Sequence, residues 1–453
     1  MLSGGLMLYP FTASSSTPVV VSRLRRGSCI FAISAALTFS SGAWSQEGSL
    51  SLLAAQQRAV ELSRQVAAKD YAVSSSRDMA VAAGQLPDPI LRAGIDNLPV
   101  NGPDRFSLTN DFMTMRRIGL MQELTRSDKR QARSERFERE AEKGLAEKSF
   151  AVASVERATA LAWLDLYYAQ AIDAAITEQR TQAKLEIQAA EGAYRAGRGN
   201  QADIFAARSA VATFDNQSSE AQRRILNAKT ILSRWIGKAA DMPLAAKPPT
   251  NEIRLDPATL DTVLLHHPEI AIVAKQAEIA AAEAKLAEAN KRADWSVEVA
   301  YQQRGPAYSN MVSVGISLPL QWDQKNRQER ELSSKLALVE QAKAERDDMV
   351  REHVAQTRAM INEWENGKER QQRYENELIP LANDRTGAVI AAYRGGKATL
   401  SEVLASRRNV IDMRLQGLQL EAETARLWAQ LNYLFPIDAV DSHQFMPIFE
   451  DSK

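Results

Sequence analysis

The sequence predicts a mainly α-helical protein with a small β part, built from two similar halves. Three observations carry this prediction. One segment occurs twice, 199 residues apart, as AYRAGRGNQADIFAAR (193–208) and AYRGGKATLSEVLASR (392–407), with six of sixteen positions identical. Long stretches without proline are rich in Ala, Glu, Gln, Arg and Leu, the composition of long helices. Two pairs of short segments alternate between apolar and polar residues, as strands do.

The first 45 residues have the pattern of a secretory signal peptide. Three arginines between residues 23 and 26 precede an apolar run from Cys29 to Phe39, and small residues then lead to a cleavage site near Gln46. At about 11 residues the run is too short to cross a bilayer, which needs roughly 20. No other stretch approaches that length, so only a closed β-barrel would place this chain across a membrane.

The first structural repeat is expected over residues 46–237. Its predicted elements are an Ala-rich helix (Leu52–Ala83), strands at about 90–98 and 112–123, a helix from Thr125 to Ala193, a glycine turn, and a helix from Gln201 to Trp235 ending at Gly237. The long helix would measure about 100 Å, which favours a coiled coil or a bundle over a globular domain. Arg116-Arg117 interrupt the alternation of the second strand.

A connector (238–257) leads to the second structural repeat, expected over residues 258–436 and followed by a C-terminal tail (437–453). Its predicted elements are a helix (Ala258–Ala289), strands at about 295–302 and 311–320, a helix from Asn326 to Ala392, a turn at Gly395-Gly396, and a helix from Thr399 to Leu434. Pro380 should kink the long helix.

The strands of the second repeat have one apolar side, which we expect to face lipid. Its residues are Trp295, Val297, Val299, Tyr301, Val312, Val314, Ile316 and Leu318. Trp and Tyr near the ends suit membrane interfaces. Four strands cannot close a barrel, for which about eight is the usual minimum, so three copies would have to pool twelve.

Composition excludes several functions. The 56 basic and 56 acidic residues balance, which gives no support for nucleic-acid binding. One cysteine, Cys29, permits neither a disulfide framework nor a Cys-based metal site. No nucleophile motif, phosphate loop or metal-ligand spacing occurs, so we expect neither an enzyme nor a cofactor.

The arrangement resembles the TolC-type outer-membrane efflux protein family, over about residues 50–436. The resemblance lies in the duplicated Tyr-Arg-x-Gly turn, in GQLPDPILRAGIDNLP (84–99) and in GISLPLQWDQKNRQE (315–329). The loop NLPVNGPDRFSLTNDFMTMRRIGLMQEL is most similar to the heavy-metal branch, which is associated with RND-type pumps and exports cations such as copper or silver.

The resemblance implies a homotrimer in the outer membrane of a Gram-negative bacterium, with most of the chain in the periplasm. A twelve-stranded barrel would continue into a long helical tunnel. A periplasmic adaptor and an inner-membrane pump would complete the conduit, and this chain would be its passive exit duct. A channel for drug efflux or type I protein secretion, and a periplasmic coiled-coil adaptor or structural protein, remain alternatives.

The resemblance also assigns site residues. The two glycine turns would contact the adaptor through Tyr194, Arg195, Gly197, Arg198, Tyr393, Arg394, Gly396 and Lys397. Glu402 would line the tunnel constriction as one member of an acidic ring, and Asp203 would tie neighbouring helices through ionic contacts. The alternative is that both acids are solvated residues near a helix start, where acids are favoured.

Two further groups could bind metal. Met113, Met115 and Met121 are soft ligands, and strand alternation would place all three on one face, although Met is more often an apolar filler. His266 and His267 precede Pro268 at the start of a predicted helix, where a structural role is favoured.

Overall fold

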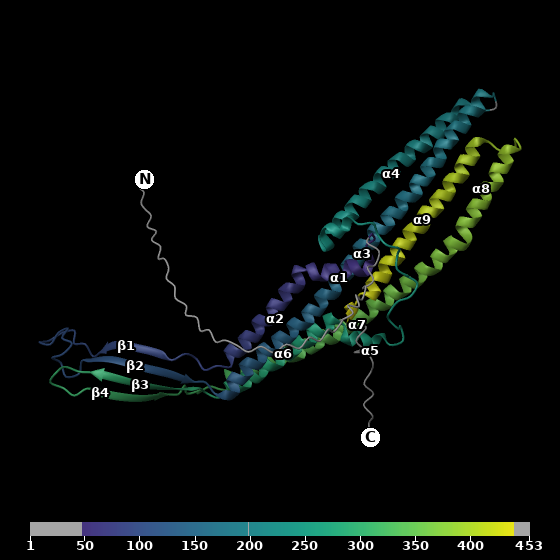
Figure 1. Ribbon diagram of the computed structural model, residues 1–453. Coiled ribbons are helices and arrows are strands. Elements are labelled where there is room, and N and C mark those ends of the chain that lie inside the picture. Colours follow the sequence, from purple (N-terminus) through teal and green to yellow (C-terminus); the bar gives the residue numbers. More distant parts are fainter. Residues whose placement is uncertain (1–47, 198, 439–453) are drawn as a thin grey trace, which may run out of the picture. The chain divides into compact units, whose positions relative to one another are not determined.

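The structure is a computed structural model that describes residues 48–197 and 199–438. The expected signal peptide, Arg198 and nearly all of the C-terminal tail lie outside these residues. Within them the chain forms helices and one antiparallel sheet (Figure 1). No helix in residues 48–197 or 199–438 is both long and apolar enough to cross a membrane.

The first half contains α1 (Leu52–Leu62), α2 (Arg64–Ala83), β1 (Ile90–Asp96), β2 (Met115–Leu124), α3 (Ser127–Arg195) and α4 (Gln201–Ile236). The single helix expected over Leu52–Ala83 is divided at Ser63. The Ser63 side chain accepts a hydrogen bond from Val66 N, 3.3 Å away, and caps α2. α3 is one unbroken helix of 69 residues, so β2 and the Gly197 turn lie at opposite ends of a rod of about 100 Å.

The second half contains α5 (Leu260–Val263), α6 (Pro268–Asn290), β3 (Trp295–Gln303), β4 (Met311–Ser317), α7 (Gln328–Arg373), α8 (Ile379–Arg394) and α9 (Leu400–Asn432). The expected helix Ala258–Ala289 begins only at Pro268, which is suited to a first helical turn because it has no N–H to leave unpaired. The expected helix Asn326–Ala392 is divided by a π-helical turn, Tyr374–Leu378, and Pro380 is the second residue of the helix that follows.

The sheet has the order β1-β2-β3-β4, with every neighbouring pair antiparallel. It therefore joins one hairpin from each half through the β2–β3 pair. β1 and β4 are its two edges, and neither has a further strand partner within the described residues. An ion pair anchors the sheet to the helices, because Lys129 Nζ of α3 lies 2.8 Å from Asp294 Oδ2, directly before β3.

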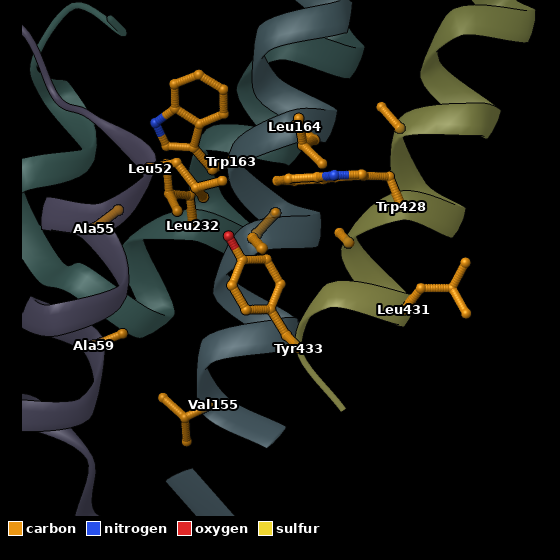
Figure 2. Close-up of a cluster of buried hydrophobic side chains, with 14 of the residues drawn as sticks. Leu52, Ala55, Ala59, Val155, Trp163, Leu164, Leu232, Trp428, Leu431 and Tyr433 are labelled. Atoms are coloured by element: carbon orange, nitrogen blue, oxygen red, sulfur yellow. The ribbon is translucent and has the colours of Figure 1, made fainter. Parts of the chain in front are cut away.

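The main core lies where α1, α3, α4 and α9 meet (Figure 2). Trp163 and Leu164 of α3 and Leu232 of α4 are fully buried there. The Trp163 indole donates to Leu50 O over 3.1 Å, and Trp364 of α7 donates to Thr250 O over 3.2 Å. A carbonyl of the segment before α1 thus accepts the hydrogen bond of the indole in the first half, and a carbonyl of the connector accepts that of the indole in the second half. The same packing scheme therefore occurs twice.

Candidate functional site

The sheet has one apolar face and one polar face, because successive side chains of a strand alternate and directly paired residues share a face. The register places these apolar residues on one face: Leu91, Ala93, Ile95, Ile118, Leu120, Leu124, Trp295, Val297, Val299, Tyr301, Val312, Val314 and Ile316. This face is open, with 69% of Val312, 70% of Val314 and 68% of Ile316 accessible. An exposed apolar surface of this extent marks contact with lipid or with another protein.

Seven of the eight residues that we expected to face lipid lie in the strands on this face. Leu318 differs, because β4 ends at Ser317 and Leu318 follows it, still half exposed. The first hairpin also contributes to the face, through Leu91, Ile118 and Leu120. The alternation of β1 is visible in the sequence, but Arg116-Arg117 obscures that of β2, so the first hairpin was not included among the residues expected to face lipid.

The opposite face carries an ion cluster. Glu298 of β3 lies 3.2 Å from Arg92 Nη1 of β1 and accepts a hydrogen bond from Arg117 of β2. Arg117 Nη1 also lies 3.8 Å from Asp96 Oδ2. Cross-strand pairs of opposite charge stabilise a sheet, and here they also set which face is polar.

The three methionines do not share one strand face. Met115 and Met121 lie on the polar face of β2, but Met113 precedes the strand, so that expectation is wrong. The cause is a local turn: Asp111 Oδ1 accepts hydrogen bonds from Met113 N at 2.8 Å and Thr114 N at 3.0 Å. An aspartate that binds the backbone two and three residues further on holds the chain away from the ladder.

The two helical turns are built alike. Gly197 follows α3 with φ of +72°, and Gly396 follows α8 with φ of +70°. Only glycine adopts this left-handed conformation without strain, which explains its place in the repeated motif. Tyr194 and Arg195 lie in the last turn of α3, as Tyr393 and Arg394 do in α8, and Lys397 N donates to Ala392 O over 2.9 Å. Arg195 is the most open of the ion-paired residues at the first turn, with 76% of its side chain accessible.

Asp203 and Glu402 each complete a capping box. Asn200 and Asp203 cap α4 reciprocally, and Thr399 and Glu402 cap α9 in the same way. Glu402 Oε2 accepts from Thr399 N at 2.7 Å and from Thr399 Oγ1 at 3.1 Å. These bonds, the backbone bond first, lower the pKa of the Glu402 carboxyl. Within the described part of one chain both acids therefore have a capping role, whatever role assembly adds.

Other residues tie the helices together near these turns. Arg407 of α9 lies 2.8 Å from Glu186 of α3, and Arg208 of α4 lies 3.1 Å from Glu191 of α3. Arg208 and Arg407 are matching positions of the repeat, so both halves direct an arginine to α3. Burial raises the pKa of Glu186, while Arg407 opposes that shift. Sequence analysis found the repeated arginines but had no signal for their partners, which lie on another helix.

One cluster has ligand types that suit a metal ion. Ligand atoms of His267, Glu269 and His353 all lie within 4.8 Å of one another. Burial first, and then His353 and Arg157, lower the pKa of His267 to about 3, so its imidazole is neutral. His267 Nδ1 accepts a hydrogen bond from Glu269 N at 3.3 Å, so the proton sits on the buried, unpaired Nε2. Because the lone pair of Nδ1 already accepts from a backbone N–H, His267 is a poor ligand for a cation, which favours a structural role.

Comparisons with known proteins relate this fold to solved structures. No family model matches the sequence, and no curated protein matches it. The outer-membrane channel OprN superposes with a TM-score of 0.70 and 16% identity over 85% of this chain and 90% of its own. The outer membrane protein VceC of Vibrio cholerae gives 0.69 and 18% over 84% and 95%. CusC, whose structures describe transmembrane channel formation, gives 0.70 and 14% over 85% and 92%. The chain therefore has the fold of these outer-membrane channel proteins.

Proposed function

We propose that this chain is one subunit of a trimeric exit duct in the outer membrane of a Gram-negative bacterium. Three copies contribute four strands each to a twelve-stranded barrel, and their helices form a tunnel in the periplasm. A periplasmic adaptor and an inner-membrane pump of the RND type deliver the substrate. The duct itself is passive and performs no chemistry.

The observation that carries this proposal is the two-faced sheet with open edges. One face exposes apolar side chains from all four strands, and the other carries the ion cluster of Glu298. A barrel wall needs this division, because its outside meets lipid while its inside is polar. Four strands are too few to close, and three copies give a closed ring without edges.

The two glycine turns are the proposed contact with the adaptor. They lie at the ends of α3 and α8, so each presents the last turn of a helix and the first turn of the next. Arg195, Arg394 and Lys397 give this surface positive charge. Arg198 belongs to the same proposal and lies outside the described residues.

The proposed substrates are heavy-metal cations such as copper or silver. Three copies of Glu402 would form an acidic ring at the constriction, and such rings favour cations. The hydrogen bonds from Thr399 favour the ionised carboxylate, and so oppose the rise in pKa that close like charges produce. Asp203 would add charge near the same end.

The test of the duct uses the full chain purified in detergent. We expect the mass of a trimer, anomalous migration when the sample is not boiled, and steady conductance in a planar bilayer. Glu402→Gln should reduce the preference for cations over anions, with Glu423→Gln on the same helix as a matched control. A detergent-independent, monodisperse monomer would contradict the proposal.

The substrate is tested separately by deletion in the source bacterium. Sensitivity to copper or silver, restored by the wild-type chain, supports metal export. Sensitivity to hydrophobic drugs alone would instead assign the duct to drug efflux, and loss of a secreted protein would assign it to type I secretion. Either outcome would contradict the proposed metal substrates but would be consistent with the proposed channel.

A further inference from the structure

Two consecutive arginines of β2 have opposite environments. Arg117 lies on the polar face and pairs with Glu298 and Asp96. Arg116 lies on the apolar face, where it is paired across the ladder with Gln303 and Ile95. Arg116 makes no ion pair with any carboxylate in the part of the chain described, and its Nη2 donates only to the carbonyl of Arg304, at 3.3 Å.

Arg304 has the same character. It directly follows β3, its guanidinium donates to the carbonyl of Phe112, and its Cζ lies 5.0 Å from the centre of the Tyr308 ring. It too lacks a carboxylate partner among the described residues. Nε of Arg116, Arg117 and Arg304 is in each case buried without a partner, so pairing with a carboxylate is what distinguishes Arg117 from the other two.

Arg116 lies at one rim of the apolar face, and Arg304 lies beside it at the same end of the sheet. Arg116 and Gln303 form the row at the loop end of the sheet, next on this face to the pair of Ile118 and Tyr301, and Arg304 directly follows Gln303. From the pair of Ile118 and Tyr301 to Leu124 and Trp295 at the helix end, the face spans seven residues, or roughly 20 Å of strand. Uncompensated cations therefore border an apolar band at the end away from the helices.

We propose that Arg116 and Arg304 bind the phosphate groups of lipid headgroups in the leaflet at the loop end of the sheet. This inference rests on the proposed outer-membrane placement and names the lipid chemistry that it meets. A guanidinium binds phosphate through two parallel N–H donors. The lipid supplies the counter-charge that Glu298 supplies to Arg117, and its acyl chains lie against Ile118, Tyr301 and Val312.

A membrane lipid fits this place better than free phosphate does. Arg116 occupies the same face as the apolar band and Arg304 adjoins its row, so one ligand can satisfy these cations and the band only if it has an anionic head and apolar chains. Phosphate alone would leave the band uncovered. Arginines placed for permeating anions would be expected on the polar face, where Arg92 and Arg117 are already neutralised by carboxylates.

The experiment compares lipid A carrying both phosphates with lipid A from which both have been removed. The full trimeric chain is titrated in neutral mixed micelles containing either lipid, and binding is followed by native mass spectrometry. The wild type should bind the phosphorylated form at least about tenfold more tightly, the effect of one charge-assisted hydrogen bond. Arg116→Gln and Arg304→Gln should each abolish most of that preference.

Arg117→Gln is the matched control, because it removes the neighbouring charge from the other face and should keep the preference. Arg304→Gln carries the test by itself if Arg116→Gln loses the trimer. Equal binding of both lipids by the wild type, retention of the preference in both variants, or full competition by inorganic phosphate would each overturn the inference. Flotation with phosphatidylcholine vesicles distinguishes failure of the lipid-phosphate inference from failure of the proposed duct. Insertion into the vesicles without a phosphate preference would contradict the inference alone, whereas no insertion would contradict both.

Discussion

The two halves of the molecule use one packing scheme but differ in continuity. Trp163 and Trp364 each donate an indole hydrogen bond to a backbone carbonyl of the segment leading into the half. α3 then runs unbroken to its glycine turn, whereas the second half passes through the π-helical turn before Pro380. Proline lacks an N–H and clashes with the preceding turn, and a π-turn takes up that clash. The two halves therefore share the indole anchors, whereas among the long helices of the described residues only that of the second half is interrupted by a π-helical turn.

The largest expected effect tests the shared anchors. Trp163→Ala and Trp364→Ala should each lower the free energy of unfolding by about 3 to 5 kcal/mol, because both side chains are buried in the main core. Thermal unfolding in detergent measures both. Trp322→Ala is the control, since its ring is 88% exposed and should contribute under about 0.5 kcal/mol. Equal losses at all three positions would contradict the assignment of the anchors.

The two halves also differ at a buried position that carries a titratable side chain only in the first half. Seven residues before Trp163 lies Glu156, and seven before Trp364 lies Thr357, both buried. Burial raises the pKa of Glu156 to about 7. A carboxyl whose pKa is raised on folding contributes stability below its unfolded pKa, and this is lost as pH rises through about 7.

Unfolding in detergent should therefore become easier from about pH 5 to about pH 8, by on the order of 2 kcal/mol. Glu156→Gln should flatten that profile. Thr357→Val, the matched change in the second half, should leave its slope intact. An unchanged slope in Glu156→Gln would assign the pH dependence to another group.

Pro380→Ala sharpens the contrast in continuity. It restores an N–H and removes the ring, so we expect α7 and α8 to join more regularly and stability to rise by about 1 kcal/mol. Hydrogen exchange of residues 374–378 should slow, while exchange in α3 should not change. Faster exchange, or a loss of stability, would show that the π-turn does not depend on proline.

The smallest effect tests the similarity of the two turns. Gly197→Ala and Gly396→Ala should each cost about 1 kcal/mol, because both glycines have positive φ. Gly192→Ala and Gly387→Ala are matched controls within α3 and α8, where an added Cβ meets nothing within 4 Å. These controls should be neutral or stabilising by up to about 1 kcal/mol. Unequal costs at Gly197 and Gly396 would break the equivalence of the turns.

Periodic and repeated features could be predicted from the sequence. α3 was expected to end at Ala193 and ends at Arg195, and β3 begins at Trp295 as expected. Such elements are long, or are bounded by glycine and proline, so pattern alone defines them. The break at Ser63 and the turn at Asp111 could not be predicted, because each depends on one side chain bonding to nearby backbone, which competes with the regular ladder.

The candidate sites were less predictable than the fold. Glu402 and Asp203 were identified by resemblance, and the structure adds the capping boxes that fix both side chains. The partners of Arg117, Arg208 and Arg407 all lie on other elements. Arg208 is 17 residues from its partner in the sequence, and the other two arginines are further from theirs. Pairings of this kind follow from register and helix packing, which a single sequence does not contain.

The two open edges of the sheet have a consequence for how the protein matures. A strand edge with free N–H and C=O groups is a template for aggregation until another chain covers it. In the proposed trimer each β1 edge pairs with the β4 edge of another copy, so neither edge is covered until the copies associate. In the proposed trimer, folding of the sheet and association would be one event, so stability should depend on protomer concentration and dilution alone should promote unfolding.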